Sequence, residues 1–203
     1  FKILRKPLGF ERGAEILQDD AQAIHASVEI DGSIVAVGRS HLIPETSDGA
    51  QSDFPGQSGP KTPPFSKLDA EHRPAIQIRQ MGTIDAYRRQ GLAAEILTAL
   101  EQASKNTFGA KCGFLQAREV AIPFYQSQGW MLIDEPYSIP NVGPHRSMMK
   151  RFWIFAPLQT VDCFIFWWAI AMKQETETNK NDSYYNKKKE VETMEMNTEA
   201  LST

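Results

Sequence analysis

The sequence predicts a mixed α/β domain, in which helices flank a central sheet. Helix-like and strand-like segments alternate over residues 76–151, and this alternation is typical of a sheet that contains parallel strands. A hairpin pattern precedes them in residues 24–43. The 203 residues are 41% hydrophobic and 23% charged, which suits one ordinary globular domain with room for a tail.

The first strands are predicted in residues 24–43. Two runs with partial apolar alternation and several β-branched residues flank Asp31 and Gly32, a pair typical of a tight hairpin turn. Residues 44–74 repeat Pro, Gly, Ser and Asp with almost no apolar periodicity, so they predict a long flexible loop within the domain. Residues 1–9 are basic and lack the apolar core of a signal peptide.

A strand, a helix and a second strand are predicted next. Residues 75–84 predict a strand. Residues 87–104 begin with a glycine-containing turn and continue as a helix, because apolar residues recur on one face from Leu92 to Leu100. Residues 112–118 predict a strand, and the helix between the two strands indicates that they run parallel.

The rest of the domain is predicted as a short helix and two closing strands. Residues 119–129 favour the helix, because Pro123 fits its first turn and Gly129 fits its end. Residues 130–133 and 145–152 predict the strands. We therefore expect the folded domain to span residues 1–151.

Two further segments follow the domain. Residues 152–172 are hydrophobic and long enough to resemble a membrane span. Asp162 stands at the midpoint of this segment and opposes insertion, so membrane attachment is the minor alternative. Residues 173–203 are polar and predict a disordered tail.

Charge and cysteine content exclude several classes of function. Residues 1–151 carry 17 basic and 17 acidic side chains without a basic block, which argues against a nucleic-acid partner. Cys112 and Cys163 lack the spacing of a metal or redox motif, so no metal is expected. Two isolated cysteines favour a reducing compartment, and we expect the protein in the cytoplasm.

The turn before the long helix has the features of a phosphate-binding loop. Backbone N–H groups at a helix N-terminus stabilise a phosphate together with the helix dipole. Gly91 allows a close approach, Ala93 is small, and Arg88 and Arg89 can add charged contacts. A surface turn without a ligand is the alternative interpretation of this short motif alone.

In this segment the chain resembles the GNAT acetyltransferases. The cofactor motif of that family, Q/R-x-x-G-x-G/A, stands here as Arg88-Arg89-Gln90-Gly91-Leu92-Ala93. Downstream, the family's short helix and Gly-aromatic pair match the following residues: Ala121, Phe124, Tyr125, Gly129 and Trp130. The resemblance covers most of residues 1–151 and implies a domain without the family's first strand.

The resemblance implies acetyl-CoA as co-substrate and a splayed pair of parallel strands that holds it. The loop residues 88–93 would bind its pyrophosphate. Met81, Gly82 and Thr83 occupy the place where the family binds the pantetheine arm along the strand. The end of an ordinary strand is the alternative for each of these three residues.

Tyr125 matches the family's general acid, which protonates the thiolate of coenzyme A as it leaves. A phenol with a pKa near 10 suits that task, although a tyrosine on a short helix is more often a packing residue. The strand before the loop lacks the carboxylate base of many relatives. His145 is the preferred candidate base and His41 the second, since histidine titrates near neutral pH.

Two other residues near these motifs are open to interpretation. Arg118, at the end of its strand, could contact the cofactor or cap carbonyl groups, and capping is favoured. Cys112 is expected to be a small core residue without a catalytic role, because direct acetyl transfer needs no acyl-enzyme.

The predicted function is direct transfer of an acetyl group from acetyl-CoA to a primary amine on a small molecule or peptide. A non-catalytic module that binds acyl-CoA is the alternative, and the missing strand carboxylate favours it. The sequence identifies neither the acceptor amine nor the oligomeric state.

Overall fold

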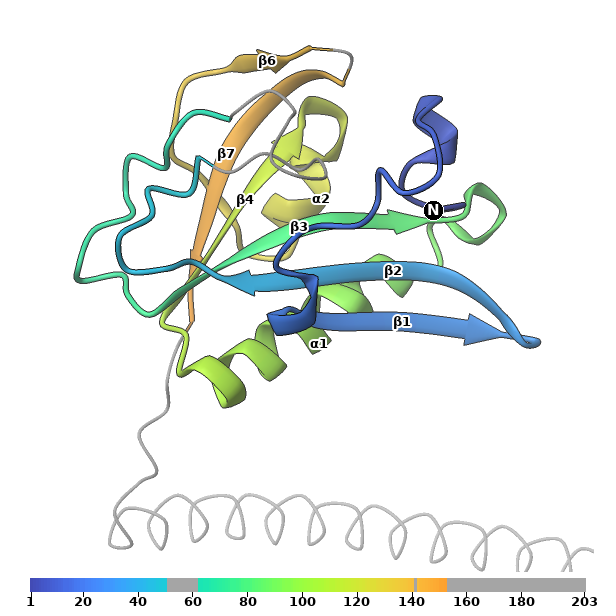
Figure 1. Ribbon diagram of the computed structural model, residues 1–203, viewed down its shortest axis with the longest axis horizontal. Coiled ribbons are helices and arrows are strands. Elements are labelled where there is room, and N and C mark those ends of the chain that lie inside the picture. Colours follow the sequence, from blue (N-terminus) through green and yellow to red (C-terminus); the bar gives the residue numbers. More distant parts are fainter. Residues whose placement is uncertain (51–61, 141, 153–203) are drawn as a thin grey trace, which may run out of the picture. The chain divides into compact units, whose positions relative to one another are not determined.

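A seven-stranded mixed sheet forms the body of the protein in a computed structural model that describes residues 1–50, 62–140 and 142–152. The main strand order is β1-β2-β3-β4-β7-β5, and β6 also pairs with β7 (Figure 1). The strands are β1 (Ile24–Ile30), β2 (Ser33–Leu42), β3 (Ala75–Thr83), β4 (Cys112–Arg118), β5 (Met131–Leu132), β6 (Tyr137–Ile139) and β7 (Gly143–Arg151). The predicted mixed α/β class is confirmed.

The predicted hairpin is present as β1 and β2. Asp31 and Gly32 have positive φ values of 49° and 71°, the combination that a two-residue turn between twisted strands requires. β2 then pairs antiparallel with β3, with a register irregularity between Val37 and Arg39. Gln80 on β3 has a φ of 54°, so the ladder bulges where β3 approaches the predicted cofactor segment.

β3 and β4 run parallel and then separate. Helix α1 (Leu92–Phe108) connects them. The parallel ladder contains only three residue pairs, from Ala75–Cys112 to Gln77–Phe114, although β3 continues to Thr83 and β4 to Arg118. This separation is the splayed strand pair that the family resemblance implies.

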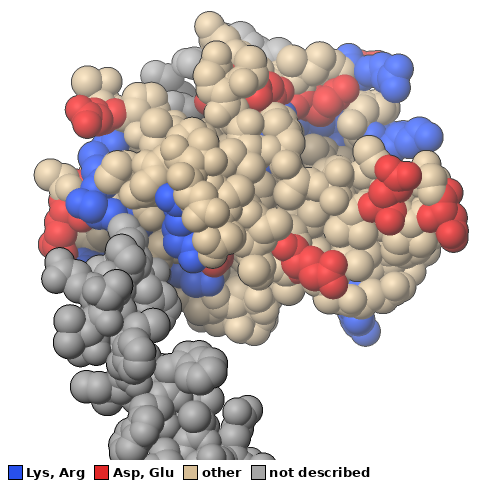
Figure 2. All heavy atoms as spheres, turned by 90° about the horizontal axis from the view of Figure 1, so that it is seen from below, with Lys and Arg blue, Asp and Glu red and all other residues tan. Residues whose placement is uncertain are grey.

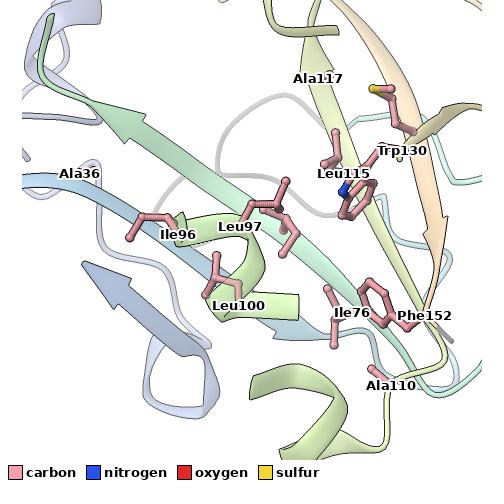
Figure 3. Packing of buried hydrophobic residues seen from close by; sticks show 12 residues of the cluster. Ala36, Ile76, Ile96, Leu97, Leu100, Ala110, Leu115, Ala117, Trp130 and Phe152 are labelled. Atoms are coloured by element: carbon pink, nitrogen blue, oxygen red, sulfur yellow. The ribbon is translucent and has the colours of Figure 1, made fainter. Parts of the chain in front are cut away.

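One face of the sheet packs against α1, and we call it the α1 face. Its core contains Ile96, Leu97 and Leu100 of the helix together with Ile76 and Leu115 of the sheet, each at most 2% exposed (Figure 3). Burying large aliphatic side chains in this way is the main favourable contribution to folding. α1 ends at Gly109, which has a φ of 62° and so provides the usual left-handed stop.

The opposite face, which we call the second face, combines a small apolar cluster with many polar side chains. Phe65, from the loop after β2, lies on Phe114 of β4 with ring centroids 5.1 Å apart. The following polar residues also point to this face and are at most 5% exposed: Arg39, His41, Gln77, Arg79, His145 and Ser147. Because side chains alternate along a strand, these residues interleave with those of the α1 face.

Short elements complete the domain. The 3-10 helices are η1 (Lys6–Leu8), η2 (Asp20–Gln22), η4 (Asp85–Tyr87) and η5 (Glu119–Ala121), and α2 (Ile122–Ser127) follows η5. α2 has Pro123 in its first turn, as predicted. β6 was not expected from the sequence.

The described parts of the predicted loop 44–74 contain no helix or strand. At the other end of the domain, Phe152 is 8% exposed and belongs to the core of the α1 face, and the remaining residues of the segments 152–172 and 173–203 lie outside the described residues. Within the described ranges, no helix is long and apolar enough to cross a membrane.

Candidate active site

A cleft of about 360 Å³ opens at the N-terminus of α1. The end of β3, the turn after it, the first turn of α1, and α2 with the residue after it supply the lining residues: Thr83, Tyr87, Arg88, Arg89, Gly91, Leu92, Ala93, Ala94, Phe124 and Gln128. Six of these are among the nine predicted cofactor residues. Met81, Gly82 and Gln90 do not line the cleft, and the Nε2 atom of Gln90 donates to the Ala86 carbonyl at 3.3 Å.

The conformation of the turn leaves the helix N-terminus uncapped. Arg89 and Gly91 have φ values of 61° and 86°, and no side chain caps the first turn of α1. The first amides that bond back to Gly91 are those of Ala94 and Glu95, at 2.8 and 3.1 Å. The N–H groups at the start of the helix are therefore available to an anion, as a phosphate site requires.

Space beside Gly91 supports the fit of a phosphate group. A Cβ atom built on Gly91 would meet no heavy atom within 4 Å, so the backbone is open on that side. Arg88 is largely exposed, and its guanidinium lies 2.7 Å from the Asp85 carboxylate. Arg89 is exposed as well, and both arginines line the cleft.

Met81 and Gly82 lie on the part of β3 that has separated from β4. Met81 packs against the core of the α1 face. At Gly82, a Cβ atom would come within 2.9 Å of Ile3 and 3.2 Å of Leu4. The N-terminal segment therefore covers one side of β3, and only glycine allows it to approach so closely.

Tyr125 on α2 reaches across to β3. Its hydroxyl donates to the Met81 sulfur at 3.9 Å, and its ring meets Phe124 and Trp130 edge-on, with centroids 5.0 and 6.2 Å apart. Burial raises the pKa of the Tyr125 phenol to about 12, while the positive charge of Arg118 opposes this shift. The hydroxyl therefore keeps its proton at neutral pH and is a possible donor to a leaving group.

His145 lies on β7, directly across from Arg118 at the end of β4. It is 5% exposed and stacks on Tyr137 of β6, with ring centroids 6.2 Å apart. Its Nδ1 atom is 2.8 Å from the Gly143 carbonyl oxygen. Because a carbonyl only accepts, Nδ1 carries the hydrogen and Nε2 of the neutral ring is the basic nitrogen.

His41, the second candidate base, lies elsewhere. It faces Gln77 in the paired part of the sheet, and its Nδ1 atom is 3.0 Å from the Asp19 carboxylate. Burial first, and then the charges of Arg79 and Arg39, lower the pKa of His41 below its ordinary 6.5, while Asp19 partly offsets them. Because Gln77 is in the last pair of the β3–β4 ladder, His41 lies where these two strands are still joined. His145 lies beside Arg118, where they have separated.

Cys112 begins β4 at the opposite end from the splay and is buried. Burial raises the pKa of its thiol to about 11, so the reactive thiolate is scarce at neutral pH. In the described ranges, no group of three or more His, Cys, Asp or Glu side chains could hold a metal ion.

Sequence reasoning missed four residues of the cleft: Tyr87, Ala94, Phe124 and Gln128. Tyr87 and Ala94 flank the predicted loop directly, so their place in the chain was a signal for them. Phe124 was recognised only as part of a family pattern, and nothing in the sequence alone indicated that α2 closes one side of the cleft.

Both a family model and a similar protein of known sequence are described as acetyltransferases. A family model described as the acetyltransferase (GNAT) family matches residues 3–130. The chain is 25% identical over 150 residues to the uncharacterized N-acetyltransferase YitI of Bacillus subtilis, which covers 73% of this chain and 85% of that protein.

Solved structures of similar proteins include a putative N-acetyltransferase from Lactobacillus plantarum. It is 21% identical with a TM-score of 0.48, and the match covers 71% of this chain and 80% of that one. Escherichia coli ElaA is 18% identical with a TM-score of 0.44, over 64% of this chain and 68% of that one.

Proposed function

Because the chain belongs to the acetyltransferase (GNAT) family, we propose that it transfers an acetyl group from acetyl-CoA to a primary amine. The observation that carries this proposal is the separation of β3 from β4 beyond Gln77 and Phe114, with the cleft at the N-terminus of α1 beside it. The splay can accept an extended ligand along the strand, and the helix N-terminus can accept its phosphates.

Residues of the cleft would bind the phosphate end of acetyl-CoA. The backbone at Gly91, Leu92 and Ala93 would donate hydrogen bonds, and Arg88 and Arg89 would add charge. In our proposal, Met81, Gly82 and Thr83 bind the pantetheine arm, although only Thr83 reaches the cleft. Acetyl-CoA supplies an activated thioester, so the protein's main task is to orient the two reactants.

The proposed reaction is a direct attack without an acyl-enzyme. The amine nitrogen forms a bond to the carbonyl carbon, and the bond from that carbon to sulfur breaks. Tyr125 gives its proton to the leaving thiolate, and Nε2 of His145 takes a proton from the amine, directly or through water. The product is an amide and free coenzyme A.

The alternative is an acyl-CoA-binding module without turnover. It is favoured by β3, which presents Gln77, Arg79 and Gln80 where many relatives have a carboxylate base. The two functions differ in one measurement, which is the release of free thiol from acetyl-CoA in the presence of amines. Binding without thiol release would support the module.

The experiment that tests the enzyme hypothesis is Tyr125→Phe. Phenylalanine keeps the ring packing against Phe124 and Trp130 and removes only the proton donor. We expect kcat to fall by about 10²-fold while acetyl-CoA affinity changes little. A structural tyrosine would instead show lower thermal stability with turnover per folded molecule preserved, and that result would contradict the assignment.

A second experiment tests the cofactor site with a matched control. Gly91→Val should weaken acetyl-CoA binding by about tenfold or more, because the side chain enters the space beside the loop. Gly109→Val is the control, since Gly109 also has a positive φ and an open Cβ direction but lies at the other end of α1. Equal effects of both variants on affinity would show that backbone strain is the cause.

We propose that the functional domain spans residues 1–151 and that the protein is cytoplasmic, with membrane attachment through 152–172 as the alternative. Phe152 packs into the core, so the shortened chain that tests this boundary ends after Phe152. Removal of residues 153–203 should leave acetyl-CoA affinity unchanged, and unfolding of the shortened chain would contradict the boundary.

A further inference from the structure

Basic side chains gather on the second face at the end where β3 and β4 separate. Arg39 of β2 is paired across the ladder with Arg79 of β3, and Arg118 of β4 is paired with His145 of β7. Four neighbouring strands therefore each contribute one basic residue at this end of the sheet.

Two of the three arginines already have carboxylate partners. Arg39 forms an ion pair with Asp20, and Arg79 lies 3.3 Å from the carboxylate of Asp19. Both aspartates lie at the start of η2, in the N-terminal segment that passes over β3 and β2 on the side opposite α1 (Figure 1). Arg39 and Arg79 are buried in this arrangement, so their positive charges are matched within the protein.

Arg118 differs from them. Its side chain is exposed, and among the described residues none forms a hydrogen bond or an ion pair with its guanidinium. Within the described ranges it therefore caps no carbonyl group, although the sequence favours a capping role. An unmatched guanidinium with five donors suits recognition of a planar carboxylate.

The position of Arg118 separates it from the phosphate site. Arg118 is not among the residues that line the cleft at α1. A phosphate bound in that cleft would therefore not account for Arg118. It is close enough to Tyr125 for its charge to oppose the rise of the phenol pKa, and it is directly across from His145. Arg118 thus lies beside both groups that would handle protons in the reaction.

We propose that the acceptor is an amine that also carries a carboxylate, and that Arg118 binds this carboxylate and so determines specificity. This inference rests on the proposed acetyltransferase function. The exposed positive charge of Arg118 disfavours a polycationic acceptor by like-charge repulsion, whereas a carboxylate on the acceptor would balance that charge.

The test uses three amines of one length that differ only in their far end. These are 4-aminobutyrate, 4-aminobutanamide and 1,4-diaminobutane, with negative, neutral and positive ends at neutral pH. A shorter series of glycine and glycinamide repeats the comparison. Thiol release from acetyl-CoA should give a kcat/KM about tenfold higher for the acid than for the amide in at least one series, with the diamine lowest.

Variants of Arg118 locate the cause of this preference. Arg118→Gln should lower the ratio of kcat/KM for the acid to kcat/KM for the amide about tenfold, and any effect through Tyr125 is shared by both acceptors and leaves this ratio unchanged. Arg118→Lys should recover part of the lost ratio. Lys111→Gln is the control, because it removes one positive charge from an exposed residue just before the other end of β4. It should change neither substrate.

Each other outcome has a definite meaning. If the amide or the diamine is the better acceptor, or if the preference for the acid survives Arg118→Gln, the specificity proposal is wrong while the acetyltransferase function stands. If acetyl-CoA binds and none of the amines is acetylated in either series, both proposals are overturned in favour of a binding module.

Discussion

The two faces of the sheet are buried to a similar degree but by different chemistry. On the α1 face, aliphatic side chains from the sheet meet Leu97 and Leu100 of the helix. On the second face, Arg79, Gln77 and Ser147 are at most 4% exposed. Burying apolar groups stabilises the fold directly, whereas burying polar groups costs free energy unless each finds a partner.

Hydrogen bonds offset this cost only in part. Gln77 donates to Gln116 at 2.7 Å, and Gln116 donates to Thr62 at 2.9 Å. By contrast, Nε2 of His41 and Oγ of Ser147 are buried without a hydrogen-bond partner among the described residues. From this contrast we expect the α1 face to contribute more to stability than the second face, which keeps polar groups that stability alone does not explain.

Charged side chains on the surface are spread more evenly than those buried on the second face. On the face that Figure 2 shows, acidic and basic side chains are interspersed among uncharged residues. The body of the chain is also balanced in total charge, with 17 basic and 17 acidic side chains up to residue 151. The unmatched guanidinium of Arg118 is therefore a local feature of the splay rather than part of a general positive potential.

The largest expected effect is on the α1 face. Leu100→Ala should lower the free energy of unfolding by about 3 kcal/mol, because Leu100 is fully buried and the change leaves a cavity. Urea unfolding measures this loss. Ile34→Ala is the control, since Ile34 is 50% exposed, and it should cost less than about 1 kcal/mol. Equal costs would contradict the view that burial on the α1 face stabilises the fold.

A smaller effect is expected from pH on the second face. The pKa of His41 is lowered in the folded state from 6.5, so the folded protein favours the neutral ring. The stability that this provides is present above pH 6.5 and is lost as the pH falls below that value, because the unfolded chain then binds the proton more readily. Thermal unfolding between pH 7.5 and 5.5 should therefore show a smaller loss of Tm in His41→Gln than in the wild type. Identical slopes would show that His41 is not responsible.

The smallest expected effect on stability comes from two fully buried serines, Ser104 and Ser147, which lie on opposite faces of the sheet. Ser104 of α1 shares a hydrogen bond of 2.8 Å with Ser40 of β2, so Ser104→Ala should cost about 1 kcal/mol by leaving Ser40 without its partner. The Ser147 hydroxyl has no partner among the described residues, so Ser147→Ala should be neutral or stabilising by up to about 1 kcal/mol. Chemical denaturation measures both changes in the free energy of unfolding. If both variants are destabilised, the two serines do not differ as proposed.

The sequence predicts well the features that depend on neighbouring residues. The hairpin, α1 and the loop at Arg88–Ala93 each follow from a local pattern of turn residues and apolar spacing. The splay was also expected, but through the family resemblance, because no local pattern shows where two distant strands stop pairing.

Features that depend on distant contacts were not predictable in the same way. The ion pairs of Asp19 and Asp20 with β2 and β3 join segments about twenty to sixty residues apart, and no spacing rule links them. The bulge at Gln80 requires a positive φ at a residue type that rarely adopts it. The sequence favours a capping role for Arg118, because it does not show which carbonyl groups lie near this side chain.

The short parallel ladder between β3 and β4 also has a consequence for amide exchange with deuterated water. Beyond Gln77, the N–H groups of β3 that face β4 have no strand partner there, so they should exchange rapidly although they belong to a central strand. N–H groups of the same strand that face β2 should be protected by the antiparallel ladder. A ligand lying between the two strands would slow the first set and leave the second unchanged, so exchange rates along β3 can map how far such a ligand extends.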